Sequence, residues 1–147
     1  MKRSQGFTLI ELMIVIAIIA ILTSIAITAY SKSISKAQLS EAFSIADGLK
    51  SGVLEYYHQN GTCPSIGTPA DGLASNTASY SGQYVASADV TTVGGTCVIT
   101  ALMRSASVTT PLRGKQVVFT MESSGSGDTQ WSCSSDAAAE YLPIACR

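Results

Sequence analysis

Glu11 is the residue whose position most strongly suggests chemistry, because it is a single carboxylate in an otherwise apolar stretch. A short basic leader with Lys2 and Arg3 precedes it, and residues 12–31 carry no charge. As a helix, these 20 residues would extend about 30 Å, enough to cross the hydrocarbon core of a bilayer. An ionisable group at membrane depth is costly, so Glu11 predicts a functional site and requires a partner.

A secretory signal and a plain membrane anchor are the simplest alternatives for this stretch. The apolar run is roughly twice the length of a signal-peptide core, and no small-residue cleavage site follows it. A plain anchor fits the length and the basic flank, but it leaves Glu11 unexplained. The plain anchor therefore stays open as an alternative from the residues alone.

The chain beyond the apolar stretch predicts a helix that continues with one apolar stripe. Apolar residues recur there at mixed three- and four-residue steps: Ile34, Ala37, Leu39, Ala42, Phe43, Ala46, Leu49, Val53 and Tyr57. Asn60-Gly61 and Cys63-Pro64 are expected to end the helix. Residues 61–81 are rich in Gly, Ser, Thr and Pro and predict an irregular surface loop.

The remaining segments predict strands. Residues 83–92, 95–104, 115–123 and 129–134 carry β-branched and aromatic residues, with breaks at Gly94-Gly95, 111–114 and 124–128. The expected fold is α+β. A long N-terminal helix, half membrane-spanning and half amphipathic, packs on a roughly four-stranded antiparallel sheet.

Composition predicts a single small domain in an oxidising compartment. From residue 31 onward there are seven Lys or Arg against nine Asp or Glu, so this part is mildly acidic. It also holds four cysteines, and an even number beyond a membrane segment indicates disulfides, with three pairings possible. There is no Cys-x-x-Cys pair and only one histidine, His58, which predicts neither a metal site nor a cofactor. No nucleophile–base constellation or phosphate loop is visible, so an enzyme is not expected.

The stretch from Gly6 to Ile19 resembles the type IV prepilin signature, specifically that of type IVa prepilins. It combines a basic leader, Gly6 before Phe7, and Glu11 one turn into a hydrophobic helix. The resemblance implies a prepilin peptidase that cuts between Gly6 and Phe7 and N-methylates Phe7. It also implies a partner for Glu11, namely the free amino group of Phe7 on a neighbouring subunit. The Glu11–Phe7 pair would then set the register of assembly.

The second half of the chain resembles the globular head of pilins. The residues that carry this likeness are Arg113-Gly114-Lys115 before a strand, Trp131 before Cys133, and Tyr141-Leu142-Pro143 before Cys146. The chain order favours the pairs Cys63–Cys97 and Cys133–Cys146, and the second pair matches the C-terminal disulfide loop that the resemblance implies.

Two positions depart from the usual pilin pattern. Ala20 and Thr28 stand where many relatives carry Gly and Pro. Without those residues the helix is expected to kink or melt less readily. Thr28 and Ser24 are expected to bend it slightly by hydrogen bonding to the preceding turn.

Three further features have simple structural interpretations. His58 is expected at the polar end of a helix, and Trp131 in the core. Arg104, Arg113 and Lys115 are expected to be solvated or to pair with a neighbouring subunit rather than to form a phosphate-binding patch.

The resemblance implies a structural subunit that polymerises into a type IV pilus. It divides the chain into a leader (1–6), a transmembrane and polymerisation helix (7–30) and a head (31–147). The head comprises an amphipathic helix (31–58), a loop (61–81), a sheet (82–134) and a disulfide loop (133–146).

The expected partners are other pilin subunits, prepilin peptidase, the assembly platform, motor ATPases and a secretin. The precursor is expected in the inner membrane and the polymer outside the cell, where the family supports surface adhesion, twitching motility and, in some members, DNA uptake. Contact with a host surface or with DNA belongs to that expectation. A minor or DNA-receptor pilin, and a pseudopilin of a type II secretion system, are the alternative functions.

Overall fold

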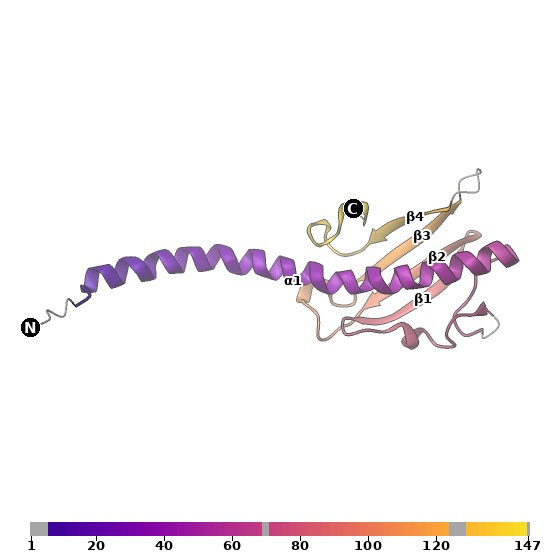
Figure 1. Cartoon of the computed structure of the whole chain (residues 1–147), viewed down its shortest axis with the longest axis horizontal. Coiled ribbons are helices and arrows are strands. Elements are labelled where there is room, and N and C mark those ends of the chain that lie inside the picture. The colour runs from indigo at the N-terminus through magenta and orange to yellow at the C-terminus, as the bar shows by residue number, and fades with distance from the viewer. Residues whose placement is uncertain (1–5, 69–70, 124–128, 147) are drawn as a thin grey trace, which may run out of the picture. The chain divides into compact units, whose positions relative to one another are not determined.

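The computed structural model describes residues 6–68, 71–123 and 129–146. Its main elements are helix α1 (Leu9–Asn60) and strands β1 (Val85–Val93), β2 (Thr96–Met103), β3 (Gln116–Ser123) and β4 (Thr129–Ser135) (Figure 1). The chain divides between Ser33 and Ile34 into two compact units, which we describe separately. From here on we call residues 7–30 the apolar segment and the second unit, residues 34–147, the head; it begins three residues after the start predicted from the sequence.

The four strands form one antiparallel sheet, as the sequence predicts, and their order in it is β1-β2-β3-β4. Gly94 and Gly95 close the first hairpin at φ values of 59° and 83°, a left-handed conformation that glycine adopts without strain. Register places Ile99 of β2 opposite Val90 on one side and Phe119 on the other. The observed strand ends lie within two residues of the predicted ones, except that the predicted break at 124–128 lies outside the described residues.

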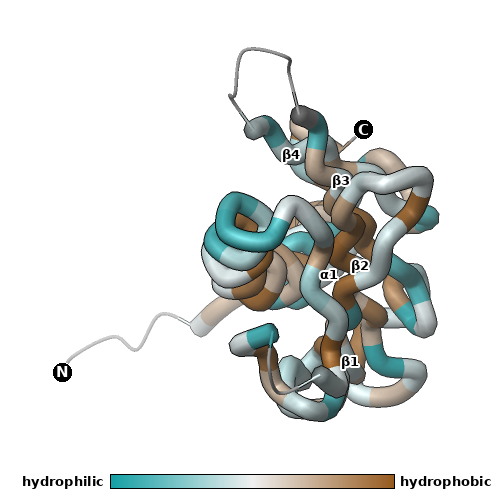
Figure 2. Tube along the Cα trace, turned by 90° about the vertical axis from the view of Figure 1, so that its right-hand side faces the viewer, coloured by the Kyte–Doolittle hydropathy of each residue, from teal (hydrophilic) through white to brown (hydrophobic). Residues whose placement is uncertain are grey.

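The part of α1 within the head packs against one face of this sheet (Figure 1). The helix contributes the buried side chains of Leu39, Ala42, Ala46, Leu49 and Val53. The tube in Figure 2 is strongly hydrophobic along β2 next to α1, where the core of the head lies. A helix on a sheet is thus the expected fold, and it is confirmed.

The helix ends where the sequence predicts. Gly61 follows Asn60 with φ of 69°, and its N–H donates to the carbonyl of Tyr57 at 2.8 Å. A glycine in this conformation terminates a helix and satisfies one of its last carbonyl groups.

The stripe of α1 that faces the sheet differs from prediction at its start. Ala37 is exposed, and the polar residues Ser35 and Gln38 are buried instead. The Ser35 hydroxyl lies 2.8 Å from the Thr109 hydroxyl, and Gln38 Oε1 accepts the Thr109 N–H at 2.8 Å. Both polar side chains therefore form hydrogen bonds inside the head, which replace the hydrogen bonds to water that burial removes.

The connecting segments contain short 3₁₀ turns that the sequence did not predict. One covers Thr77–Tyr80 inside the predicted irregular loop, and the Asn76 side chain caps it. Two more, Ala139–Tyr141 and Ile144–Cys146, shape the C-terminal loop.

Candidate functional site

The N-terminus of α1 is closed by a reciprocal pair of hydrogen bonds between Thr8 and Glu11. Glu11 N–H donates to Thr8 Oγ1 at 3.3 Å, and Thr8 N–H donates to Glu11 Oε2 at 2.9 Å. The Thr8 hydroxyl also donates to Oε2, at 2.7 Å. This arrangement is a capping box, which fixes the carboxylate at the helix start. The sequence carries the signal for this cap, Thr8-x-x-Glu11 before an apolar run, although the cap was not among the predicted features.

The two carboxylate oxygens of Glu11 therefore differ in the hydrogen bonds that they accept. Oε2 accepts both hydrogen bonds from Thr8, whereas Oε1 accepts none from any described residue. The capping box thus holds the carboxylate in place and leaves one oxygen open to a cationic partner.

Gly6 and Phe7 precede the helix and are exposed. Phe7 keeps 85% of its surface accessible, and a side-chain atom added at Gly6 would meet nothing within 4 Å. This dipeptide is therefore accessible and lies outside the helix.

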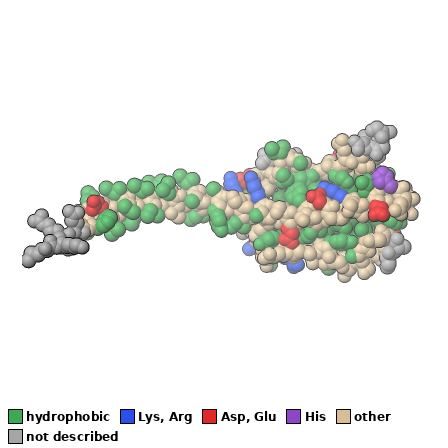
Figure 3. All heavy atoms as spheres, in the orientation of Figure 1, with side chains coloured by type: hydrophobic (Ala, Val, Ile, Leu, Met, Phe, Trp, Pro, Cys, Tyr) green, Lys and Arg blue, Asp and Glu red, His purple; other side chains and the backbone are tan. Residues whose placement is uncertain are grey.

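The apolar segment buries none of its side chains. Every residue from Gly6 to Ser33 is exposed, and hydrophobic side chains cover this part of the chain (Figure 3). Of the helices in the described chain, α1 is long and apolar enough to cross a membrane, with a mean hydropathy of 2.8 in an 18-residue window. So much exposed apolar surface requires lipid or protein around it.

The helix passes through Ala20 and Thr28 without interruption. The expected side-chain bonds to the preceding turn are made by other residues, since Thr23 donates to the carbonyl of Ile19 at 2.8 Å and Ser33 to that of Ala29 at 3.1 Å. Among the described residues, Ser24 and Thr28 make no such bond, so the expected hydrogen bonds are absent at these two positions, whereas the expected bend of the helix stays a prediction.

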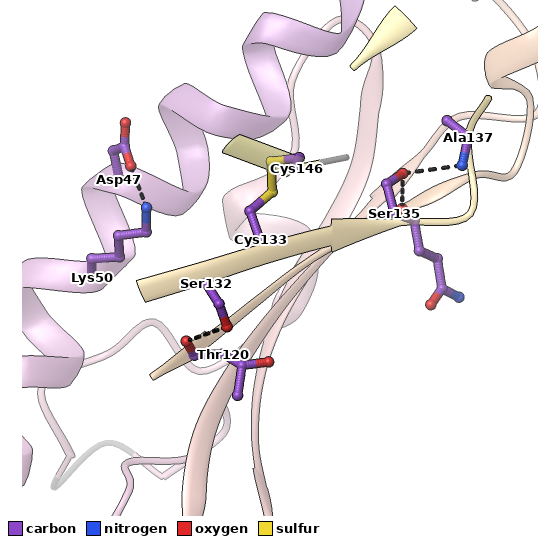
Figure 4. The surroundings of a disulfide bond; sticks show 9 residues. Asp47, Lys50, Thr120, Ser132, Cys133, Ser135, Ala137 and Cys146 are labelled. Atoms are coloured by element: carbon purple, nitrogen blue, oxygen red, sulfur yellow. Dashed lines mark hydrogen bonds and ion pairs between the residues drawn. A yellow bond between two sulfur atoms is a disulfide. The ribbon is translucent and has the colours of Figure 1, made fainter. Parts of the chain in front are cut away.

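Both disulfides lie in the head. Cys63–Cys97 joins the loop after α1 to β2, and Cys133–Cys146 joins β4 to the C-terminal turn (Figure 4). The second bond bounds the C-terminal loop, as predicted.

A family model for pilins, the proteins of bacterial filaments, matches residues 35–147, and a model of the prokaryotic N-terminal methylation motif matches residues 1–27. The chain belongs to the pilin family. This pilin is 46% identical over 143 residues to the fimbrial protein EcpC of Eikenella corrodens, a match that covers 97% of this chain and 90% of that protein.

Two other relatives support the same assignment. The type IV major pilin protein PilE1 of Neisseria gonorrhoeae is 41% identical over 129 residues, covering 88% of this chain and 74% of that protein. A fimbrial protein of Moraxella nonliquefaciens is 38% identical over 151 residues, covering 99% and 97% of the two chains.

Two of the three cations singled out in the sequence, Arg104 and Lys115, have partners within the pilin head. Arg104 is partly buried, and it donates from Nε and Nη2 to the Gly82 carbonyl at 3.1 and 3.0 Å, a contact within the chain that the sequence did not predict. Lys115 lies 3.6 Å from Asp136, and Arg113 is exposed. Because two of the three groups have partners within the chain, the geometry does not favour a phosphate-binding stripe.

Other polar groups of the pilin head have structural roles. His58 is exposed near the end of α1, as predicted, and Trp131 packs half-buried against the core. A hydrogen bond to the Asp71 carboxylate raises the pKa of the Tyr56 phenol above its usual value. Tyr56 and Asp71 line a polar hollow of about 480 Å³ beside the end of α1.

Proposed function

We propose that this pilin is a structural subunit that polymerises into a type IV pilus through its apolar segment. The observation that carries the proposal is an apolar segment in which every residue is exposed and whose single carboxylate keeps one oxygen open. The names of the relatives, fimbrial protein and type IV major pilin protein, support a role as the main filament subunit. Membership of a filament family supports a structural role and not an enzymatic one.

Residues 7–30 hold the precursor in the inner membrane before assembly. Lipid tails are as apolar as the packed helices of a filament, so apolar burial alone does not favour the polymer over the membrane. Assembly motors therefore supply the work of extraction, and a polar contact supplies the specificity.

That polar contact is the ion pair between Glu11 of one subunit and the Phe7 amino group of a neighbour. Cleavage between Gly6 and Phe7 by the prepilin peptidase creates the amine, and N-methylation leaves it able to carry a positive charge. The cut leaves the Thr8 N–H and hydroxyl intact, so the capping box persists in the mature subunit. Oε2 then keeps Thr8 while Oε1 receives the amine, and a mismatched register would leave two unpaired charges.

The head faces outward in the pilus and is stabilised by its own core and disulfides. In that position it mediates the surface adhesion and twitching motility typical of the family. The assembly platform, motor ATPases and secretin are the partners that move subunits from the inner membrane to the cell surface.

Intact-mass spectrometry of filaments sheared from cells tests this function. The expected dominant species begins at N-methylated Phe7 and has the mass of a chain with two disulfides. If filaments form with this chain as a trace component, it is a minor subunit. If the chain stays entirely in the envelope fraction, the pilus role fails and a secretion-system pseudopilin replaces it.

A further inference from the structure

The head contains an apolar groove of about 660 Å³ between α1 and the C-terminal loop. Leu39 and Leu142 are buried in it, and Phe43 and Tyr141 line it half-buried. At its rim Ile144 keeps 85% of its surface accessible, which makes it one of the two most exposed large hydrophobic residues in the described chain. A groove of this size and lining is suited to a small apolar ligand or to an acyl chain.

The same groove carries a cation. Lys36 lines it, is exposed, and forms no ion pair with any described residue. No acidic side chain contributes to the lining. A positive charge beside an apolar groove matches an amphiphile with an anionic headgroup.

Covalent connectivity keeps this groove close to the membrane in the precursor. Lys36 lies only six positions after Tyr30, which is at the end of the apolar segment. Even a fully extended chain of six residues spans at most about 20 Å, so Lys36 stays within that distance of the end of the segment in every orientation of the head. When the apolar segment spans the bilayer, Lys36 is therefore held within about 20 Å of the end of that segment, on the side where the head leaves the membrane.

We infer that this groove binds an anionic phospholipid of the membrane that holds the unassembled subunit, with an acyl chain along Leu39 and Phe43 and the headgroup phosphate at Lys36. Such contact covers apolar surface that water would otherwise meet, and basic side chains next to a bilayer are attracted to anionic lipids. Extraction into the filament would strip the lipid and free the groove. The inference rests on the proposed membrane-spanning state of the precursor.

Site-specific photo-crosslinking of the full chain in vesicles tests the inference. A benzophenone amino acid replaces Ile144, and in a matched control it replaces Val93, another exposed apolar residue, which lies at the end of β1. Vesicles of phosphatidylglycerol and phosphatidylethanolamine are illuminated, and adducts are identified by mass. We expect several-fold more lipid adduct at position 144 than at 93. A third labelled position, Pro143, repeats the measurement in case the first variant does not form its disulfides.

A charge reversal separates specific binding from mere proximity to lipid. Lys36→Glu should lower the phosphatidylglycerol adduct several-fold, whereas Arg113→Glu, the same change at an exposed cation outside the groove lining, should leave it unchanged. Equal adduct yields at 143, 144 and 93, or adducts to a second copy of the chain, would overturn the inference. Carbonate extraction of the same vesicles tests membrane insertion separately: a chain that extracts refutes the membrane state itself, whereas an inserted chain without lipid adducts refutes only the groove.

Discussion

The apolar segment and the head differ in how their hydrophobic side chains are shielded from water. Every residue of the segment is exposed, whereas the head buries a core of apolar residues between α1 and the sheet and fastens its loops with two disulfides. The head thus contains the partners for its core side chains. The segment, by contrast, depends on surroundings that change from lipid to other subunits. Substitutions in the two regions should therefore separate folding from assembly.

The largest expected contrast is between two isoleucines. Ile99 is fully buried in β2, so Ile99→Ala should lower the free energy of unfolding of the head by about 2–5 kcal/mol. Ile18 is 52% exposed in the apolar segment, and Ile18→Ala should leave head stability unchanged. Urea unfolding in detergent, followed by the fluorescence of Trp131, measures both. If the two variants lost the same free energy of unfolding, the apolar segment would contribute to head stability and the two regions would not be independent.

Removal of the C-terminal disulfide should have the next largest effect. Cys133→Ser opens a loop with a sequence separation of 13 residues, which should destabilise the head by about 3 kcal/mol on the loop-entropy estimate. Fewer filaments should follow, although cleavage at Gly6 stays normal. The measurements are thermal melting and filament yield. An unchanged melting temperature with normal filaments would show that this bond does not support the head.

The buried contact of Gln38 should have a smaller effect. Gln38→Ala leaves the Thr109 N–H without its acceptor and should cost about 1–3 kcal/mol. Lys36→Ala, an exposed position two residues earlier on the same helix, is the control and should cost little. Urea unfolding of both variants compares them, and equal stabilities would mean that water replaces the lost acceptor.

The smallest expected effect concerns Lys50. Its ammonium group lies 4.3 Å from the Phe119 ring centroid and 2.7 Å from Asp47 Oδ1 (Figure 4 shows the ion pair). Lys50→Gln should cost about 0.5–1 kcal/mol, since the group is largely covered by the head. Far-UV circular dichroism during urea unfolding measures this loss of stability. The fluorescence of Trp131 is unsuitable here, because the substitution at Lys50 lies close enough to change it directly. A loss as large as that of Ile99→Ala would contradict this ranking.

Local signals account for the parts of the fold that the sequence could predict. Glycine pairs and apolar periodicity predicted α1, the four strands and the turn at Gly94-Gly95. The burial of Ser35 and Gln38 could not be predicted in this way, because their shared partner Thr109 lies about 70 residues away in the chain. The contact of Arg104 with Gly82 is also non-local. The Thr8–Glu11 capping box was local and could have been predicted.

The filament yield of a Glu11→Gln variant tests the central claim most directly. Glutamine can keep the hydrogen bonds to Thr8, because its amide oxygen is an acceptor, but it removes the charge that pairs with the Phe7 amine. The account predicts cleaved, N-methylated subunits that stay in the membrane and form few filaments. Thr8→Val is the matched control, since it weakens the cap by about 1 kcal/mol and keeps the charge, so its filaments should form. Normal filament yield from cleaved Glu11→Gln subunits would contradict the claim.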